Sequence, residues 1–133
     1  MILHLGLSNI NPKQLAEAQA ITEIVCVQNL YNVVRRNDDN FIDDLAGQGI
    51  AYVPFFPLGG FTPLQSATLD TAAVSLQSTP MQVALAWLLQ RSPNILLIPG
   101  TSSAEHLREN LKAATLQLPS DLIAKLDSIS GEN

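Results

Sequence analysis

The hydrophobic positions of the chain fall into short apolar runs separated by segments with helical spacing. Four of these runs are rich in apolar and β-branched residues, and most are nearly continuous rather than alternating. They cover Ile2–Leu7, Glu23–Asn29, Ile50–Phe56 and Asn94–Pro99. Near-continuous apolar runs are typical of parallel strands that are covered on both faces. We therefore predict four parallel strands, the third of which bends or loses pairing where Pro54 removes a ladder donor.

The segments between these runs carry apolar residues at helical spacing and recognisable start signals. The expected helices cover residues 11–20, 38–49, 79–92, 102–114 and 120–129. Asn11 and Thr79 each precede a proline, which is the pattern of an N-cap followed by proline at the first helical position. Ser102 lies three residues before Glu105, the spacing of a capping box. Gly49 is expected just beyond the end of the second helix.

The order of these elements predicts the fold class. Strand and helix alternate four times, with extra helices after the third strand and at the end. Such alternation is typical of right-handed βαβ units on a parallel sheet, so we predict an α/β fold. Residues 1–133 are expected to form one domain, because this length suits a single hydrophobic core.

The amino-acid composition limits the kinds of binding partner that we expect for this chain. Hydrophobic residues make up 47% and charged residues 14% of the chain, and the net charge is −5. A negative protein is a poor ligand for nucleic acid or anionic membranes, so neither is expected. A lone cysteine, Cys26, and the lack of an apolar run of membrane-spanning length predict a cytoplasmic protein. The sparse charge indicates a weakly charged surface, or apolar surface that meets a partner.

Polar residues follow the first two apolar runs. Ser8 and Asn9 come after the first, where they either bind a ligand or only form the turn that caps the next helix. Gln28 and Asn29, followed by Tyr31 and Asn32, close the second run with more polar groups than a buried strand end requires. These groups either face a ligand or bond to neighbouring backbone.

Two further segments offer ligand chemistry. An aromatic ring at Phe55 or Phe56 could stack on a planar group, and Gly59 and Gly60 allow backbone N–H groups close to a phosphate, although phenylalanine in a sheet is usually core. Residues 100–103 supply hydroxyls at an expected helix start, which suits either a phosphate or a simple helix cap. No Ser-His-Asp set and no cluster with metal-ligand spacing is present, so we predict no catalytic residue and no metal ligand.

Four segments taken together carry a family resemblance. "HLGLSN", "VQNLYN", "PFFPLGG" and "IPGTSSAEHLREN", in this order and at these intervals, resemble the C-terminal half of the aldo-keto reductase family. The resemblance covers essentially the whole chain. It implies the last four βα units of a TIM-type (β/α)8 barrel, from a family that reduces aldehydes and ketones with NADPH and without a metal.

The resemblance also implies a set of cofactor contacts. Ser8, Asn9 and Gln28 would hydrogen-bond the nicotinamide carboxamide, and Phe55 would stack on its ring. The residues further along the cofactor would be Leu58 and Gly59 at the pyrophosphate, Thr101, Ser102 and Ser103 at the 2′-phosphate, and Glu109 and Asn110 near the adenine.

Two departures from the family pattern change what is expected of this chain. Many members carry Lys in place of Gly100 and Arg in place of His106, so the grip on the 2′-phosphate of NADP(H) is expected to be weak or lost, and the preference for NADP over NAD is less secure. The family's catalytic Asp, Tyr, Lys and His come from the first four strands, which have no counterpart here. Tyr31 and Tyr52 lie on the wrong strands to replace the catalytic tyrosine. The chain alone is therefore expected to lack reductase activity.

A barrel of this type closes with eight strands, so a half-barrel of four strands exposes two sheet edges. Such edges are stabilised by pairing with another chain. We therefore expect a homodimer or a higher oligomer. Two functions stay open from the sequence: an NADP(H)-binding half of an oxidoreductase, or a non-catalytic half-barrel scaffold that self-assembles. A third alternative is complementation by a separate N-terminal chain.

Overall fold

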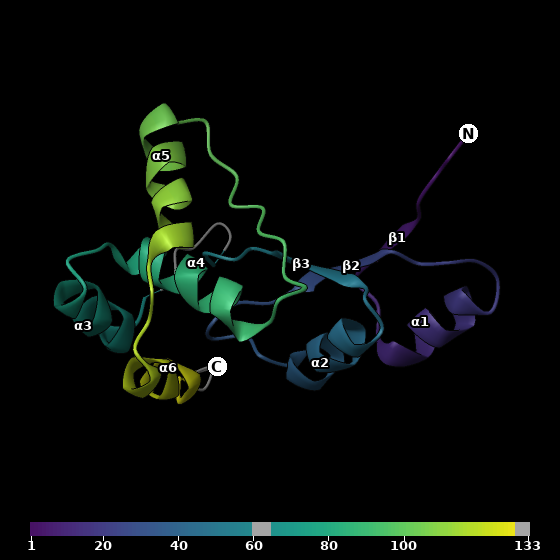
Figure 1. Cartoon of the computed structure of the whole chain (residues 1–133), viewed down its shortest axis with the longest axis horizontal. Coiled ribbons are helices and arrows are strands. Elements are labelled where there is room, and N and C mark those ends of the chain that lie inside the picture. The colour runs from purple at the N-terminus through teal and green to yellow at the C-terminus, as the bar shows by residue number, and fades with distance from the viewer. Residues whose placement is uncertain (60–64, 130–133) are drawn as a thin grey trace.

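The computed structural model describes residues 1–59 and 65–129. Within these described residues, three strands and six α-helices follow one another, with helices placed between and after the strands (Figure 1). The strands are β1 (Gly6–Ser8), β2 (Cys26–Leu30) and β3 (Ala51–Phe55). The helices are α1 (Pro12–Gln19), α2 (Asp39–Gly47), α3 (Ala67–Ser75), α4 (Pro80–Arg91), α5 (Ala104–Lys112), the 3₁₀ turn η1 (Ala113–Thr115) and α6 (Ser120–Asp127). The predicted α/β class is confirmed.

The sheet is parallel, with the strands in the order β1-β2-β3. Its register runs Ser8 to Gln28 across the first pair and Gln28 to Val53 across the second. β1 is shorter than the predicted run, because Met1–Leu5 precede its ladder with β2 and are exposed. The arrangement is a half of a parallel barrel, as predicted.

The fourth predicted strand is reduced to a single bridge between Tyr52 and Ile95. Tyr52 N–H donates to the Asn94 carbonyl at 2.8 Å, and Leu96 N–H donates to the Tyr52 carbonyl at 2.9 Å. The next donor in this parallel ladder would be the residue two beyond Tyr52, which is Pro54 and has no N–H. Pro54 therefore ends the pairing on this side, while its pairing with Asn29 of β2 continues.

Helices cover one face of the sheet, and the expectation of cover on both faces is wrong within the described residues. In β2 and β3 the side chains alternate: Val27, Asn29 and Tyr52 are buried, and the residues between them are only half-buried. The core lies on the buried face, where Tyr52, Tyr31 and Trp87 are at most 1% exposed. Figure 1 shows α1 and α2 together on one side of the strands. The other face is the inner surface of the half-barrel.

The start signals read from the sequence are mostly confirmed. Asn11 and Thr79 both form capping boxes with the residue three positions on and are followed by proline. Gly49 follows α2 with a φ of +71°, a conformation that favours glycine. The capping box at Ser102 is wrong, because α5 begins one residue later and Ser103 accepts the capping hydrogen bond from His106 N–H.

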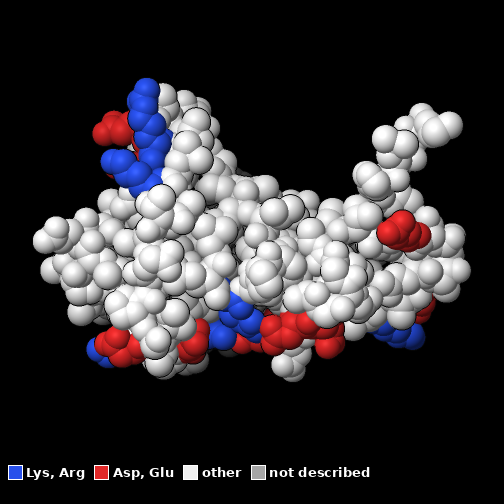
Figure 2. Space-filling model, in the orientation of Figure 1, with Lys and Arg blue, Asp and Glu red and all other residues white. Residues whose placement is uncertain are grey.

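The charged side chains are unevenly spread over the face of the molecule that Figure 2 draws. Figure 2 shows most Asp, Glu, Lys and Arg along the lower edge and on α5, with an almost uncharged surface between α5 and the N-terminal segment. In the described part of the chain, no helix is long and apolar enough to cross a bilayer.

Candidate functional site

The carboxyl ends of β1 and β2 bring three of the predicted cofactor residues together. Ser8 and Gln28 are partners in the parallel register, so their side chains lie side by side on the inner face of the sheet. Asn9 follows with a φ of +56°, and its N–H donates to the Gln28 carbonyl at 2.8 Å. A hydroxyl and two carboxamides at one sheet edge can donate to and accept from a planar amide.

The carboxyl end of β3 contributes an aromatic group and a tight turn. The rings of Phe55 and Phe56 meet edge to face with their centres 5.5 Å apart. Gly59 N–H donates to the Phe56 carbonyl at 3.0 Å, and Gly59 has a φ of +93°. Leu58 packs against the core. Phe55 and Gly59 thus follow the same end of the sheet as Ser8 and Gln28, whereas Gly60 lies outside the described residues.

The remaining predicted residues lie at or on α5. Thr101 Oγ1 accepts from Ser103 N–H at 3.1 Å, and the Ser103 hydroxyl accepts from His106 N–H at 3.3 Å. Two of the three hydroxyls therefore serve the helix start as acceptors, while Ser102 is exposed. The Glu109 carbonyl accepts from Gln82 Nε2 at 3.1 Å.

Figure 1 shows α5 rising from the body of the molecule with its N-terminal end at the tip, apart from the strand ends. No residue of α5 is buried. The structure therefore divides the predicted cofactor residues into a group at the strand ends and a group on α5 and directly before it. Asn110 is half-buried on the same helix as Glu109.

For two polar residues beside the first group, the sequence left open whether they face a ligand or bond to neighbouring backbone. Asn29 and Asn32 are 7% and 2% exposed. Their side chains bond to the backbone of Ile10 and Phe56, which follow β1 and β3. The sequence signal was the density of polar groups closing β2, and the alternative that they bond to neighbouring backbone is correct for these two.

A second polar group lies on the helix-covered side. The Tyr31 hydroxyl donates to Asp39 at 2.5 Å, and the Tyr52 hydroxyl donates to Asp38 at 2.8 Å. Burial, followed by these hydrogen bonds, raises the pKa of both phenols above the ordinary value. Both tyrosines are therefore neutral hydrogen-bond donors in the core rather than acid–base groups at the strand ends.

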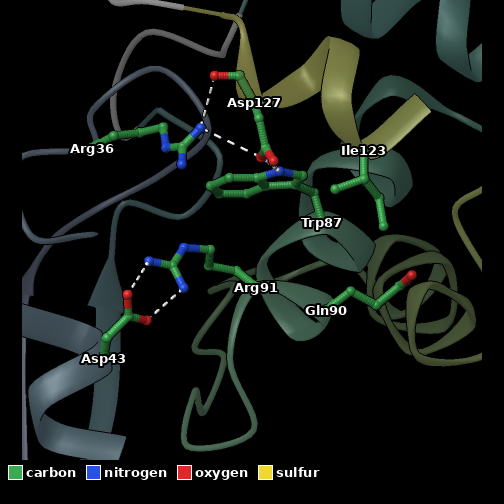
Figure 3. Close-up of a pocket in the computed structure, with 7 residues that line it drawn as sticks. All are labelled: Arg36, Asp43, Trp87, Gln90, Arg91, Ile123 and Asp127. Atoms are coloured by element: carbon green, nitrogen blue, oxygen red, sulfur yellow. Dashed lines mark hydrogen bonds and ion pairs between the residues drawn. The ribbon is translucent and has the colours of Figure 1, made fainter. Parts of the chain in front are cut away.

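Beside this group is a cavity of about 400 Å³, drawn in Figure 3. Its lining residues come from the loop before α2 and from α2, α4 and α6: Arg36, Asp43, Trp87, Gln90, Arg91, Ile123 and Asp127. None of the predicted cofactor residues lines it.

The cations in this cavity are already paired. Arg91 holds Asp43 with two hydrogen bonds of 2.8 and 3.2 Å, which raise the pKa of Arg91 and lower that of Asp43. Arg36 bonds to Asp39 at 2.7 Å and lies 5.0 Å from the Trp87 ring. We read this cavity as a packing junction between α2, α4 and α6. Within the described ranges, no group of three His, Cys, Asp or Glu residues is placed to hold a metal ion.

Comparisons with known proteins give the chain a family. The model of the aldo/keto reductase family matches residues 1–131. The chain is 67% identical over 132 residues to pyridoxine 4-dehydrogenase of Escherichia coli (strain K12), which covers 99% of this chain and 46% of that protein. It is 42% identical over 128 residues to an uncharacterized oxidoreductase of Schizosaccharomyces pombe, covering 96% of this chain and 42% of that protein. The chain thus spans somewhat less than half the length of these curated relatives.

Solved structures agree with the fold. A thermostable aldo-keto reductase in complex with the inhibitor epalrestat matches with a TM-score of 0.87 at 33% identity, over 96% of this chain and 48% of that one. An aldose reductase from Giardia lamblia has a TM-score of 0.85 at 24% identity, over 95% of this chain and 44% of that one, and shares the fold. The family model, the relatives and the parallel half-barrel agree: this chain belongs to the aldo/keto reductase family.

Proposed function

We propose that this chain is the C-terminal, NADP(H)-binding half of an aldo-keto reductase-type oxidoreductase. The observation that carries the proposal is the pairing of Ser8 with Gln28 on the inner face of the sheet. A hydroxyl and a carboxamide on neighbouring strands suit the two-sided hydrogen bonding of a nicotinamide amide. Phe55, half-buried at the end of β3, offers an aromatic face on the same side. These residues fit the cofactor, which would supply hydride when bound.

The binding test is a titration of NADPH followed by its fluorescence. Saturable binding is expected, and it should be lost in the double variant Ser8→Ala with Gln28→Ala. The matched control is Ser128→Ala with Gln19→Ala, which removes the same groups from the residue that caps the end of α6 and from the last residue of α1. Absence of saturable binding in the parent chain would overturn the proposal.

The proposed binding of the cofactor's 2′-phosphate can be tested by adding positive charge near residues 101–103. A Cβ at Gly100 would meet no atom within 4 Å, so Gly100→Lys is accommodated without a clash. Together with His106→Arg it should tighten NADPH binding more than NADH binding, since only NADPH carries the 2′-phosphate. Gly47→Lys with His4→Arg adds the same charge elsewhere, and Gly47 also has open space. Equal tightening by both pairs would show a general charge effect and no site at residues 101–103.

The isolated chain is proposed to bind without turnover. Hydride transfer to a carbonyl needs a proton donor at its oxygen, and Tyr31 and Tyr52 are engaged with Asp39 and Asp38 in the core. Purified chain should therefore show no NADPH-dependent aldehyde reduction. Activity that co-purifies with the chain and disappears in the Ser8 and Gln28 double variant would refute this.

We also propose that the chain associates with a second copy of itself. Leu107 and Leu111 on α5 are 51% and 66% exposed, and Ile2 and Leu3 in the segment before β1 are 75% and 82% exposed. Apolar helix faces and open sheet edges are stabilised by pairing with another chain. Sedimentation should show a dimer or larger species that Leu111→Lys dissociates. A stable monomer at micromolar concentration would contradict this proposal.

If self-association occurs without NADPH binding, the second function, a non-catalytic scaffold, is favoured. If a partner chain instead supplies the first four strands, co-expression should restore turnover. The relative that is 67% identical is named pyridoxine 4-dehydrogenase, so pyridoxine is the first substrate to test in such a complemented assembly.

A further inference from the structure

Two buried asparagines at the end of β2 bond to the segments that directly follow the neighbouring strands β1 and β3. We call these two segments the strand exits. Asn29 holds Ile10 by two hydrogen bonds: its Oδ1 accepts from Ile10 N–H at 3.0 Å, and its Nδ2 donates to the Ile10 carbonyl at 2.7 Å. We call such side-chain bonding to a strand exit a clamp. Asn32 reaches the other way, and its Nδ2 donates to the Phe56 carbonyl at 3.1 Å. The two amides therefore tie the segments after β1 and β3 to the central strand.

Each tied exit contains a residue in the left-handed backbone region. Asn9, directly before Ile10, has a φ of +56°, and Phe56 has a φ of +54°. For residues other than glycine this region costs about 1–3 kcal/mol, and it persists only where surrounding contacts impose it. Phenylalanine tolerates it poorly, whereas asparagine tolerates it better. The side-chain clamps are contacts of the kind that impose such a conformation.

Both clamps require a carboxamide. Asn29 Nδ2 also donates to Asp38 Oδ2 at 2.7 Å, and this carboxylate accepts from the Tyr52 hydroxyl as well. The acceptor-only carboxylate fixes which end of the amide is the donor. Asn32 Oδ1 accepts from Val34 N–H at 3.1 Å and from Arg35 N–H at 3.0 Å. An aspartate in either position would keep the acceptor and lose the donor.

The clamped segments carry the proposed cofactor contacts. Ser8 and Asn9 directly precede Ile10, and Phe55 directly precedes Phe56. The Phe56 carbonyl also accepts from Gly59 N–H at 3.0 Å, so the bond from Asn32 reaches the turn that contains Gly59. The asparagines themselves are buried and lie behind these contacts.

We propose that Asn29 and Asn32 are positioning residues, which hold the two strand exits in the conformation that binds the nicotinamide end of the cofactor. This inference rests on the proposed NADP(H) function. Without a clamp, the binding-competent conformation is only partly populated, and the apparent Kd rises by the inverse of that population.

The selective variant is Asn32→Asp. It keeps the acceptor for Val34 and Arg35 and replaces the donor to Phe56 by a carboxylate oxygen, which repels the Phe56 carbonyl. The Kd for NADPH should rise about tenfold, the equivalent of about 1.4 kcal/mol. Adding Phe56→Asn, a residue that tolerates the left-handed region, should recover much of this loss. Asn29→Ala should raise the Kd as well, measured at a temperature where circular dichroism shows it folded.

The matched control is Asn94→Ala, because Asn94 Nδ2 also bonds to backbone, donating to the Ile50 carbonyl at 2.9 Å at the amino end of β3. This control should lower the melting temperature without changing the Kd. If Asn94→Ala raises the Kd as much as Asn32→Asp, or Phe56→Asn recovers nothing, the two asparagines have a general structural role only.

Amide hydrogen exchange tests the positioning role of Asn32 independently of the proposed NADP(H) binding. In Asn32→Asp the Gly59 amide should exchange about tenfold faster, while the Tyr52 amide, bonded to Asn94 in the sheet, should keep its protection. If the parent chain fails to bind NADPH, the proposed function is wrong, and the exchange result still decides whether Asn32 holds the exit. Unchanged exchange at Gly59 would overturn the positioning role.

Discussion

Replacing Asp127 by alanine and by asparagine separates a buried hydrogen bond from a surface charge. Asp127 Oδ1 accepts from the Trp87 indole N–H at 2.9 Å and lies 3.4 Å from Arg36 Nη1. Trp87 is 1% exposed, so Asp127→Ala leaves a buried donor without a partner, at a cost of about 1–3 kcal/mol in the free energy of unfolding. Asp127→Asn keeps an oxygen acceptor for the indole.

The ion pair is the smaller contribution, because the Arg36 and Asp127 side chains are 21% and 44% exposed. Pairs of this kind are worth about 0–1 kcal/mol. Both variants also remove a negative charge from the C-terminal end of α6, where it is unfavourable, so this gain cancels between them. The alanine variant should therefore be about 1–3 kcal/mol less stable than the asparagine variant.

The measurement is urea unfolding followed by the fluorescence of Trp87, the single tryptophan of the chain. The indole senses the same site that the substitution changes, and circular dichroism checks that helices and indole unfold together. If the two variants have the same free energy of unfolding within about 0.5 kcal/mol, the indole hydrogen bond does not stabilise the fold and the reasoning is refuted.

Three further predictions test other parts of the structure. Gly6→Ala places a Cβ 2.4 Å from Cys26 Sγ and should cost about 1–3 kcal/mol, while adding Cys26→Ala should recover most of it in thermal melts; no recovery would contradict the contact. Asp43→Asn should cost up to about 1 kcal/mol at pH 7. Because Arg91 lowers the Asp43 pKa, this contribution is present above the unfolded pKa and is lost as pH falls through the folded value, so a gap in urea midpoints that persists at pH 2 would count against it. Tyr52→Phe should lessen the loss of stability above about pH 10, where burial and Asp38 keep the folded phenol neutral while the unfolded one ionises; parallel alkaline unfolding curves would disprove this.

Local chemistry decided the parts of the fold that the sequence predicted well. The N-caps Asn11 and Thr79 and the glycine after α2 were readable because capping depends on a few adjacent residues. The fourth strand was predicted too long, although Pro54 was recognised as a lost donor. The register of the ladder decides whether Pro54 loses a hydrogen bond to β2 or to the segment around Ile95. No local sequence pattern contains that register.

The candidate site also combines features that the sequence determines with features that only the tertiary structure decides. The sequence alone determined the parallel α/β class and the polar residues that follow the strands, since both depend on residue type and order. Only the tertiary structure decided that Ser8 lies beside Gln28 and that α5 stands apart. It also decided that Asn29 and Asn32 bond to the backbone of the segments that follow β1 and β3. A side chain's partner across a sheet is set by register and burial, and residues far apart in the chain fix both.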